Sequence, residues 1–270
     1  MLTEKQRFLM DTYGYLIVPD LVDAELIQRI RQAMDDMDRS LPVVPHDNTT
    51  TPHGHSRKVV GTPSFSKFSP CIEYAPVFLE IAMHPGIISY VEDIVGGPVR
   101  YEEQECSINK RDPDAHTIGH VRELGWHRGI SPDFSCYAGA GRNHYLWIKA
   151  IVFLTDIGPE DGGTSVMPGT HRADPQGKMI PEVEPWMVHQ AQGAAGSVLF
   201  FSEALIHSVT PILSDKTRYI MITGYVPPFM REYGPMEAPS AEFLASLNEK
   251  ERAFMTGNAT PNDNRYHFRM

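Results

Sequence analysis

Apolar residues follow a helical period in the first hundred positions of the chain, and a strand period or unbroken runs after them. Behind Asp23, a residue type that caps helix N-termini, apolar side chains recur every three to four positions as far as residue 39. The stripe consists of Leu26, Ile27, Ile30, Met34 and Met37. It predicts a helix with one buried face. Further helices are expected at residues 4–13, 76–95 (interrupted at 84–85 and ended by two glycines) and 241–255.

The run from Tyr145 to Thr155 is too apolar for a strand with one solvated face, so it predicts a central strand of a sheet. Residues 42–70 and 129–143 contain many turn-forming residues and are expected to be loops. Residues 161–172 are expected to form two turns around a short strand. The remaining strands are expected at residues 13–19, 99–109, 196–201, 206–209 and 217–225.

This order of elements, helices first and then many strands, favours a mainly β fold with flanking helices, a double-sheet barrel or jelly roll. We expect a single domain over residues 1–270. Its helical N-terminal part covers about residues 1–97, its jelly-roll core about 98–226 and its helical tail 227–270.

The composition narrows the classes of partner. The chain has 270 residues, 41% of them apolar, and a formal net charge of −10. This charge argues against a nucleic acid as partner, although a local basic pocket can still hold one small phosphorylated molecule. No apolar run of about 18 residues is present to span a membrane, and the N-terminus lacks the apolar core of a signal peptide. The cysteines Cys71, Cys106 and Cys136 form no paired motif, so we expect a reducing, cytoplasmic setting.

Two histidines, His127 and His207, are the candidate metal ligands. His127 leads out of a polar segment, and His207 lies in a strand-rich region. Non-haem iron oxygenases hold iron(II) with two histidines and one carboxylate, usually as His-x-Asp or His-x-Glu, because alternate residues of a strand point to the same side. Here the carboxylate position is Gly129. Either the site is inactive, or something other than the side chain of residue 129 fills that coordination position.

Four features together resemble the phytanoyl-CoA dioxygenase family. They are His127, the Gly-Gly-x-x-x-x-Pro-Gly-x-His segment at 162–171, His207, and Arg218 eleven residues beyond it. The resemblance covers the chain from its opening strand to about Tyr225. It implies a double-stranded β-helix (cupin-like jelly roll), with iron(II), 2-oxoglutarate and O2 as cofactors. It assigns the metal to His127 and His207 and the distal carboxylate of 2-oxoglutarate to Arg218, whose fork can read a carboxylate bidentately.

The glycine at 129 is the departure from the family pattern. A similar replacement by glycine or alanine marks the iron- and 2-oxoglutarate-dependent halogenases, which are related to this family. The resemblance therefore implies that chloride or bromide occupies the space beside Gly129 and supplies the missing negative charge. The expected reaction is halogenation of an unactivated aliphatic C–H group: a hydrogen atom is abstracted, and the carbon radical then takes the halogen.

Other interpretations stay open at this point. Glu123 or Asp133 could fold back and replace the missing acid. The chain could be a hydroxylase that uses water in the third position, an engineered acid-to-glycine variant of one, or a metal-free, non-catalytic 2-oxoglutarate-binding module. We expect the loop histidines His46, His53 and His55 to be solvated rather than to bind metal.

The substrate is expected to be a freestanding small molecule, a nucleotide or an amino-acid-like compound. Arginines together with aromatic residues suit a phosphorylated nucleoside, with ordinary loop composition as the alternative explanation. No basic or exposed apolar helix offers a dock for a carrier protein, so a tethered substrate is not expected. The candidate substrate residues are Arg57, Lys58, Phe65, Phe68, Arg128, Tyr137, Arg142, Phe229 and Arg231.

Overall fold

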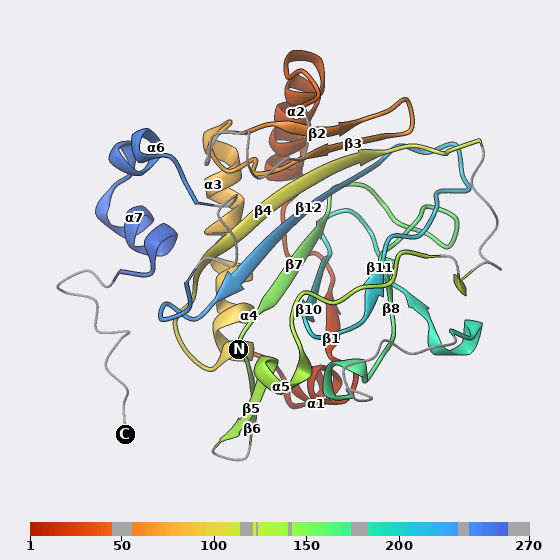
Figure 1. The fold of residues 1–270 in the computed structure, drawn as a ribbon, viewed down its shortest axis with the longest axis vertical. Helices are drawn as coiled ribbons and strands as arrows, with labels where there is room; N and C mark the ends of the chain where they lie inside the picture. Colours follow the sequence, from red (N-terminus) through yellow and green to blue (C-terminus); the bar gives the residue numbers. More distant parts are fainter. Residues whose placement is uncertain are drawn as a thin grey trace.

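A seven-stranded sheet forms the centre of the computed structural model (Figure 1). The structure describes residues 1–44, 56–113, 121–122, 124–139, 142–173, 183–231 and 238–258, with residues 137–139 and 142 described by their backbone alone. The strand order is β1-β10-β7-β12-β4-β3-β2, and each of these pairings is antiparallel. The strands are β1 Tyr15–Val18, β2 Lys58–Gly61, β3 Phe65–Phe68, β4 Arg100–Asn109, β7 Ile148–Phe153, β10 Val198–Ser202 and β12 Arg218–Val226.

The prediction of a central strand within Tyr145–Thr155 is confirmed. β7 lies between β10 and β12, and all six of its residues are buried. A strand that is covered on both faces gains from apolar side chains at every position, which explains the unbroken run.

A smaller three-stranded sheet, in the order β11-β8-β9, lies on one side of the large sheet. Helices α2, α3 and α4 cover the opposite side (Figure 1). A two-stranded hairpin is separate from both sheets. These shorter strands are β5 Cys136–Gly139, β6 Arg142–Tyr145, β8 Ser165–Val166, β9 His189–Gln190 and β11 His207–Ser208.

The helices begin and end where local chemistry predicts. The Asp23 side chain accepts a hydrogen bond from the N–H of Leu26 (2.9 Å), and the predicted apolar stripe of α2 is buried. Gly96 ends α4 in the left-handed conformation with φ 86°. The helices are α1 Glu4–Tyr13, α2 Ala24–Ser40, α3 Pro76–Ala82, α4 Pro85–Val95, α5 Pro132–Ser135, α6 Ala241–Ser246 and α7 Glu249–Thr256, with short 3-10 turns η2 Thr170–Arg172 and η3 Pro185–Met187. Within the described chain, no helix is both long and apolar enough to cross a bilayer.

The apolar interior is divided by the large sheet. In β10, Val198 and Phe200 join a large cluster that includes the buried faces of α2, α3 and α4. Leu199 and Phe201 point the other way and join a smaller cluster beside the small sheet. This alternation is the period of two that a strand imposes, with both faces buried.

Three predictions of local structure are wrong. The expected loop at 42–70 contains β2 and β3, which extend the edge of the large sheet beyond β4. The expected loop at 129–143 contains α5 and part of the β5–β6 hairpin. The expected single C-terminal helix is two helices, because Asn248 caps a new one by accepting from the N–H of Glu251 (3.0 Å) while the Glu251 carboxylate accepts from the N–H of Asn248.

Candidate active site

A backbone bridge brings the two candidate ligand histidines face to face. The N–H of His127 donates to the carbonyl of His207 (3.0 Å), and the N–H of His207 donates to the carbonyl of His127 (2.9 Å). Residues directly opposite each other in an antiparallel pair present their side chains on the same face. The two imidazole centroids are accordingly 4.3 Å apart. Residues 80 positions apart in sequence therefore form one two-imidazole site.

Each imidazole is fixed by the backbone two residues before it. Nδ1 of His127 lies 2.9 Å from the carbonyl of Gly125, and Nδ1 of His207 lies 2.8 Å from the carbonyl of Leu205. A carbonyl only accepts, so both Nδ1 atoms carry a proton, and Nε2 is the atom of each ring that can bind a metal. Burial, with a smaller contribution from His127, lowers the pKa of His207 to about 3, which keeps that ring neutral. Two imidazoles that each offer Nε2 in this way fit iron(II).

An acid from another part of the chain lies where the side chain of residue 129 would be. The N–H of Gly129 donates to the backbone carbonyl of Glu203 (2.9 Å). A Cβ built on Gly129 would lie less than 3.0 Å from Oε2 of Glu203, a separation that real Cβ atoms essentially never show. The space expected for a halide is therefore taken by a carboxylate. Asp133 is exposed on α5, so it does not replace the missing acid, and Glu123 lies outside the described residues.

Glu203 belongs to a buried charged cluster. Its Oε1 lies 3.9 Å from Nζ of Lys149, which also lies 3.7 Å from Oε2 of Glu102 and in close contact with Glu103. Burial raises the pKa of the Glu203 carboxyl, and Lys149 and His127 oppose that rise. Three carboxylates thus share one buried ammonium group. In the part of the chain that is described, no three His, Cys, Asp or Glu side chains are grouped to hold a metal ion as they are placed.

Arg218 is buried at the start of β12 with part of its hydrogen-bonding capacity unused. It is 2% exposed, and its Nε and Nη1 atoms have no hydrogen-bond partner. Its Nη2 donates to the side-chain oxygen of Asn109 in the amide orientation that satisfies both groups. Burial lowers the pKa of Arg218 to about 10. A buried guanidinium with two free donors fits a carboxylate bound as a fork, as the distal carboxylate of 2-oxoglutarate would be.

Gly162 lies between Arg218 and Thr210, next to the small sheet that contains His207. A Cβ on Gly162 would lie 2.7 Å from the carbonyl of Thr210 and 3.2 Å from Nη1 of Arg218. The hydroxyl of Thr210 is 2.6 Å from that of Ser165, on the strand that pairs with β11. The glycine-rich turn at 162–163 therefore leaves room beside the guanidinium.

The histidine of the Gly-Gly-x-x-x-x-Pro-Gly-x-His segment, His171, does not join this site. It is fully buried, its Nε2 lies 3.5 Å from the hydroxyl of Tyr145, and its ring packs against the backbone of Gly14 after α1. Burial, with the nearby charge of Arg172, lowers the pKa of His171 to about 4. His171 therefore joins α1 to the β-structure and offers nothing to a metal.

Among the candidate substrate residues whose side chains are described, Phe65 shares a face of the large sheet with Arg218. In the register of the large sheet it is opposite Asn109, which in turn is opposite Arg218, so the three share one face. Arg128 is half-buried, and its Nη1 donates to the carbonyl of Ala173 (3.4 Å). The others are placed as follows: Arg57 is buried, Phe229 and Arg231 are exposed, and Tyr137 and Arg142 lie on β5 and β6 with their side chains not described.

Two further candidates, Lys58 and Phe68, already have partners within the protein. Lys58 forms an ion pair with Asp38 (2.6 Å), and Phe68 is fully buried in the large apolar cluster. Both side chains have strong local partners, so neither is available to a ligand. His46, His53 and His55 lie outside the described residues.

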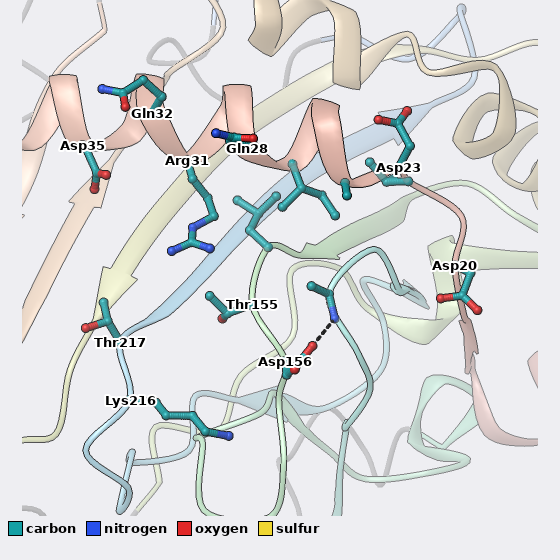
Figure 2. A pocket seen from close by; sticks show the side chains of 15 residues that line it. Asp20, Asp23, Gln28, Arg31, Gln32, Asp35, Thr155, Asp156, Lys216 and Thr217 are labelled. Carbon is teal, nitrogen blue, oxygen red and sulfur yellow. Dashed lines mark hydrogen bonds between the residues drawn. The ribbon is translucent and has the colours of Figure 1, made fainter.

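A groove of about 1140 Å³ between α2 and the loops next to β7 and β12 contains neither histidine. Figure 2 shows Arg31 reaching from α2 towards Thr155, with Lys216 on the far side of the groove. The charged groups of this groove have partners: Arg31 lies 4.8 Å from the centre of the Tyr219 ring, and Lys216 pairs with Asp161 (2.8 Å). The groove is therefore a separate feature.

Neither Glu203 nor Lys149 was predicted from the sequence. Both are charged residues inside mostly apolar runs, Val198–Ile206 and Tyr145–Leu154. Because a charge in such a run is buried only when it is paired or functional, that position in the sequence was the available signal.

Comparison with known proteins agrees with this architecture. HygX from Streptomyces hygroscopicus, solved with nickel and 2-oxoglutarate bound, is 22% identical with a TM-score of 0.66, over 90% of this chain and 94% of HygX. AviO1 from Streptomyces viridochromogenes Tue57 is 16% identical with a TM-score of 0.63, over 86% of this chain and 98% of AviO1. The epimerase SnoN from nogalamycin biosynthesis is 20% identical with a TM-score of 0.60, over 83% of this chain and 80% of SnoN.

At these identities the similarity establishes the fold, a mostly antiparallel sheet with flanking helices. The family is shown by a sequence model described as Phytanoyl-CoA dioxygenase (PhyH), which matches residues 10–220. The chain belongs to the phytanoyl-CoA dioxygenase (PhyH) family.

Proposed function

We propose that this protein is an iron(II)- and 2-oxoglutarate-dependent oxygenase that oxidises an aliphatic C–H group of a freestanding small molecule. The observation that carries the proposal is the pair of imidazoles at His127 and His207, each with Nδ1 bound to a carbonyl and Nε2 free. These Nε2 atoms would hold the iron. The unused donors of Arg218 would bind the distal carboxylate of 2-oxoglutarate. Iron, 2-oxoglutarate and O2 together supply an oxidant that can remove a hydrogen atom from carbon.

The protein would contribute position and protection. The antiparallel bridge fixes the backbone positions of the two histidines, and the contacts of their Nδ1 atoms with the carbonyls of Gly125 and Leu205 orient the rings. Phe201, edge-on to His207 with centroids 4.7 Å apart, covers that ring from the apolar side. We further propose that the large and small sheets form one jelly-roll domain around this site.

The class of substrate is supported by two of the similar structures. HygX was solved with nickel, 2-oxoglutarate and hygromycin B bound, and SnoN with Fe3+, alpha ketoglutarate and nogalamycin RO. Both ligands are small molecules, so the proposed substrate of this chain is also a small molecule of natural-product biosynthesis. A nucleotide or an amino-acid-like compound remains our proposal for its chemistry.

Halogenation with chloride or bromide is the second candidate, and Gly129 is the observation that favours it, because the residue carries no carboxylate. Against it stands the carboxylate of Glu203 in the same space. An anion already in that space repels a halide and leaves it no volume. We therefore propose oxygen transfer to the substrate as the first candidate reaction and halogenation as the second.

Anaerobic addition of iron(II) and 2-oxoglutarate tests the proposal, and a visible metal-to-ligand absorption band is expected. Admission of O2 in the presence of candidate nucleotides and amino acids is expected to give succinate and a product heavier by one oxygen atom. A chlorine isotope pattern in the product would favour the second candidate. An absorption band without succinate would leave a non-catalytic binding module, and the absence of a band would contradict the proposal.

A further inference from the structure

We propose that Glu203 supplies the carboxylate that the His127-x-Gly129 segment lacks, and that it acts as the third protein ligand of the metal. This inference rests on the proposed function, because it presumes a metal between His127 and His207. It goes further by assigning a ligand from a different segment of the chain and by stating which anion the metal does not take.

The position of the carboxylate is the first argument. In a His-x-Asp segment, the Cβ of the third residue directs the acid towards the metal. Here Oε2 of Glu203 reaches the place of that Cβ from across the chain, where the carbonyl of Glu203 accepts from the N–H of Gly129 (2.9 Å). Glutamate has one methylene more than aspartate, and this extra length suits an approach from the neighbouring segment.

The glycine itself is the second argument. Gly129 lies outside the left-handed region, so its backbone conformation does not call for glycine. Residue 129 is crowded instead: a Cβ there would lie less than 3.0 Å from Oε2 of Glu203, so the carboxylate would have to turn away. Gly129 and Glu203 are therefore complementary, with the glycine making room for the acid.

The charge around Lys149 is the third argument. Its ammonium is closer to Glu103 and Glu102 than to Glu203, whose Oε1 is 3.9 Å away and beyond hydrogen-bond reach. Glu203 is 5% exposed, and a buried carboxylate without a close cation is costly. A divalent cation on the two imidazoles would supply that counter-charge.

Binding requires Glu203 to turn. As placed, the two imidazoles and this carboxylate do not form a three-ligand group, because Oε2 is directed at Gly129. The terminal torsion of a glutamate is broad and costs little to change. With Glu203 on the metal, the protein fills the third position and a halide is excluded from it.

Titration of the metal-stripped protein with Co(II) alone tests the assignment without turnover, because the visible spectrum of Co(II) responds to its ligands. The natural chain is expected to bind Co(II) with a spectrum that chloride does not change. Glu203→Ala is expected to weaken Co(II) binding by at least about 100-fold, beyond the effect of a group next to a ligand. Its spectrum is expected to become chloride-dependent, because the vacated position admits an anion.

Glu102→Gln is the matched control. It removes another buried acid at almost the same distance from Lys149, 3.7 Å against 3.9 Å, that does not approach Gly129. It is expected to change Co(II) affinity far less than Glu203→Ala does. Glu203→Gln keeps the size of the side chain and removes its charge, so it provides a second reading if Glu203→Ala folds poorly.

Moving the acid back to residue 129 is the sharpest form of the experiment. Gly129→Asp alone crowds Glu203 and is expected to weaken Co(II) binding. Gly129→Asp combined with Glu203→Ala is expected to recover most of the affinity that Glu203→Ala loses. Recovery would show that an acid at either position serves the same metal, and a lack of recovery would count against Glu203 as a ligand.

The outcomes separate this inference from the proposed function. If the natural chain binds Co(II), but Glu203→Ala and Glu203→Gln bind it equally tightly with the same spectrum, Glu203 is not a ligand and the proposed function stands. A chloride-dependent spectrum in the natural chain would also overturn the assignment. Failure of the natural chain to bind Co(II) at all would contradict the proposed function itself.

Discussion

The two faces of the seven-stranded sheet carry opposite chemistry on the same strands. On the face covered by α2–α4, β12 contributes Met221 and Tyr225 to the large apolar cluster, and the Tyr225 hydroxyl donates to the carbonyl of Ala82 (2.9 Å). On the other face, β12 begins with Arg218, which keeps two donors without partners. On the helix face the Tyr225 hydroxyl has its partner, whereas on the inner face the guanidinium of Arg218 has donors that a bound anion would satisfy.

The helix face of the large sheet provides most of the stability, and the inner face carries the functional groups. Apolar burial on the helix face contributes roughly 1.5–3 kcal/mol for each large side chain. Lys149, Glu203 and Arg218 on or beside the inner face are buried charges, which lower stability unless they are paired. The inner face can hold a reactive site because the helix face stabilises the strands that both share.

The largest expected effect is on the inner face, at His207. His207→Ala removes one of two imidazoles, so we expect metal affinity to fall by more than about 100-fold, beyond the loss typical for a residue that only supports a ligand. Co(II) titration measures it. His171→Asn, which alters another buried histidine, serves as control and is expected to keep metal affinity. Equal losses in both variants would show that any buried histidine affects binding, and the contrast would fail.

A smaller loss is expected at the other end of the inner face. Arg218→Lys keeps the charge but loses the planar fork, so 2-oxoglutarate affinity is expected to fall by about 30- to 100-fold, or about 2–3 kcal/mol. Calorimetric titration of 2-oxoglutarate into the metal-loaded protein measures it. Arg111→Lys is the control, since Arg111 is an exposed residue paired with Asp215. Unchanged affinity in Arg218→Lys would mean that the distal carboxylate binds elsewhere.

The buried His171 leads to a prediction about how the free energy of unfolding depends on pH. Its pKa in the folded chain, about 4, is below the ordinary 6.5, so the unfolded chain binds the proton more readily. The contribution of His171 to stability is therefore complete above pH 6.5 and is lost as the pH falls towards 4. Between pH 7.5 and 5 the loss is expected to be about 2 kcal/mol.

Urea unfolding of the metal-stripped chain and of His171→Asn at both pH values checks this expectation. The pKa of His207 is lowered in both proteins, so its effect on the pH dependence cancels between them. The difference in free energy of unfolding between the two proteins therefore reports on His171. Tyr145, Asp11 and Arg172 surround His171 in both proteins as well. If the difference in free energy of unfolding between the two proteins is no smaller at pH 5 than at pH 7.5, the role assigned to His171 is contradicted.

The smallest effect is expected outside both faces. Phe229 is 78% exposed, so Phe229→Ala is expected to change the free energy of unfolding by less than about 0.5 kcal/mol. A raised KM with unchanged stability would support its suggested contact with substrate. A stability loss above about 1 kcal/mol would show that Phe229 packs in a way that its exposure conceals.

Much of the fold could be predicted because its determinants are local. The stripe of α2 and its Asp23 cap, and the unbroken apolar run of β7, each lie within one segment. β2 and β3 were missed because each has four residues, and β3, which pairs with β2, is held in the sheet by pairing with β4 more than 30 residues later. The break between α6 and α7 was signalled by Asn248 with Glu251 three positions later, and that signal was overlooked.

The residues of the candidate site also divide into those that the sequence predicts and those that it does not. His127, Gly129, His207 and Arg218 stand in a recognisable spacing, and the structure brings the two histidines together. Glu203 could not be placed beside Gly129 from the sequence, because their proximity depends on a backbone hydrogen bond between segments 74 residues apart. Spacing predicts which residues share a motif, whereas it does not predict which residue fills a gap in that motif.

The overlap between a Cβ at residue 129 and the carboxylate of Glu203 has a consequence for engineering. The two positions are epistatic: an acid introduced at 129 competes with Glu203 for the same space and, if Glu203 is a ligand, for the same coordination position. Saturation mutagenesis of position 129 by itself would therefore test every side chain against a Glu203 that has to turn away, and would underestimate what the scaffold tolerates. Libraries that vary 129 and 203 together open combinations that no series of single substitutions reaches through active intermediates.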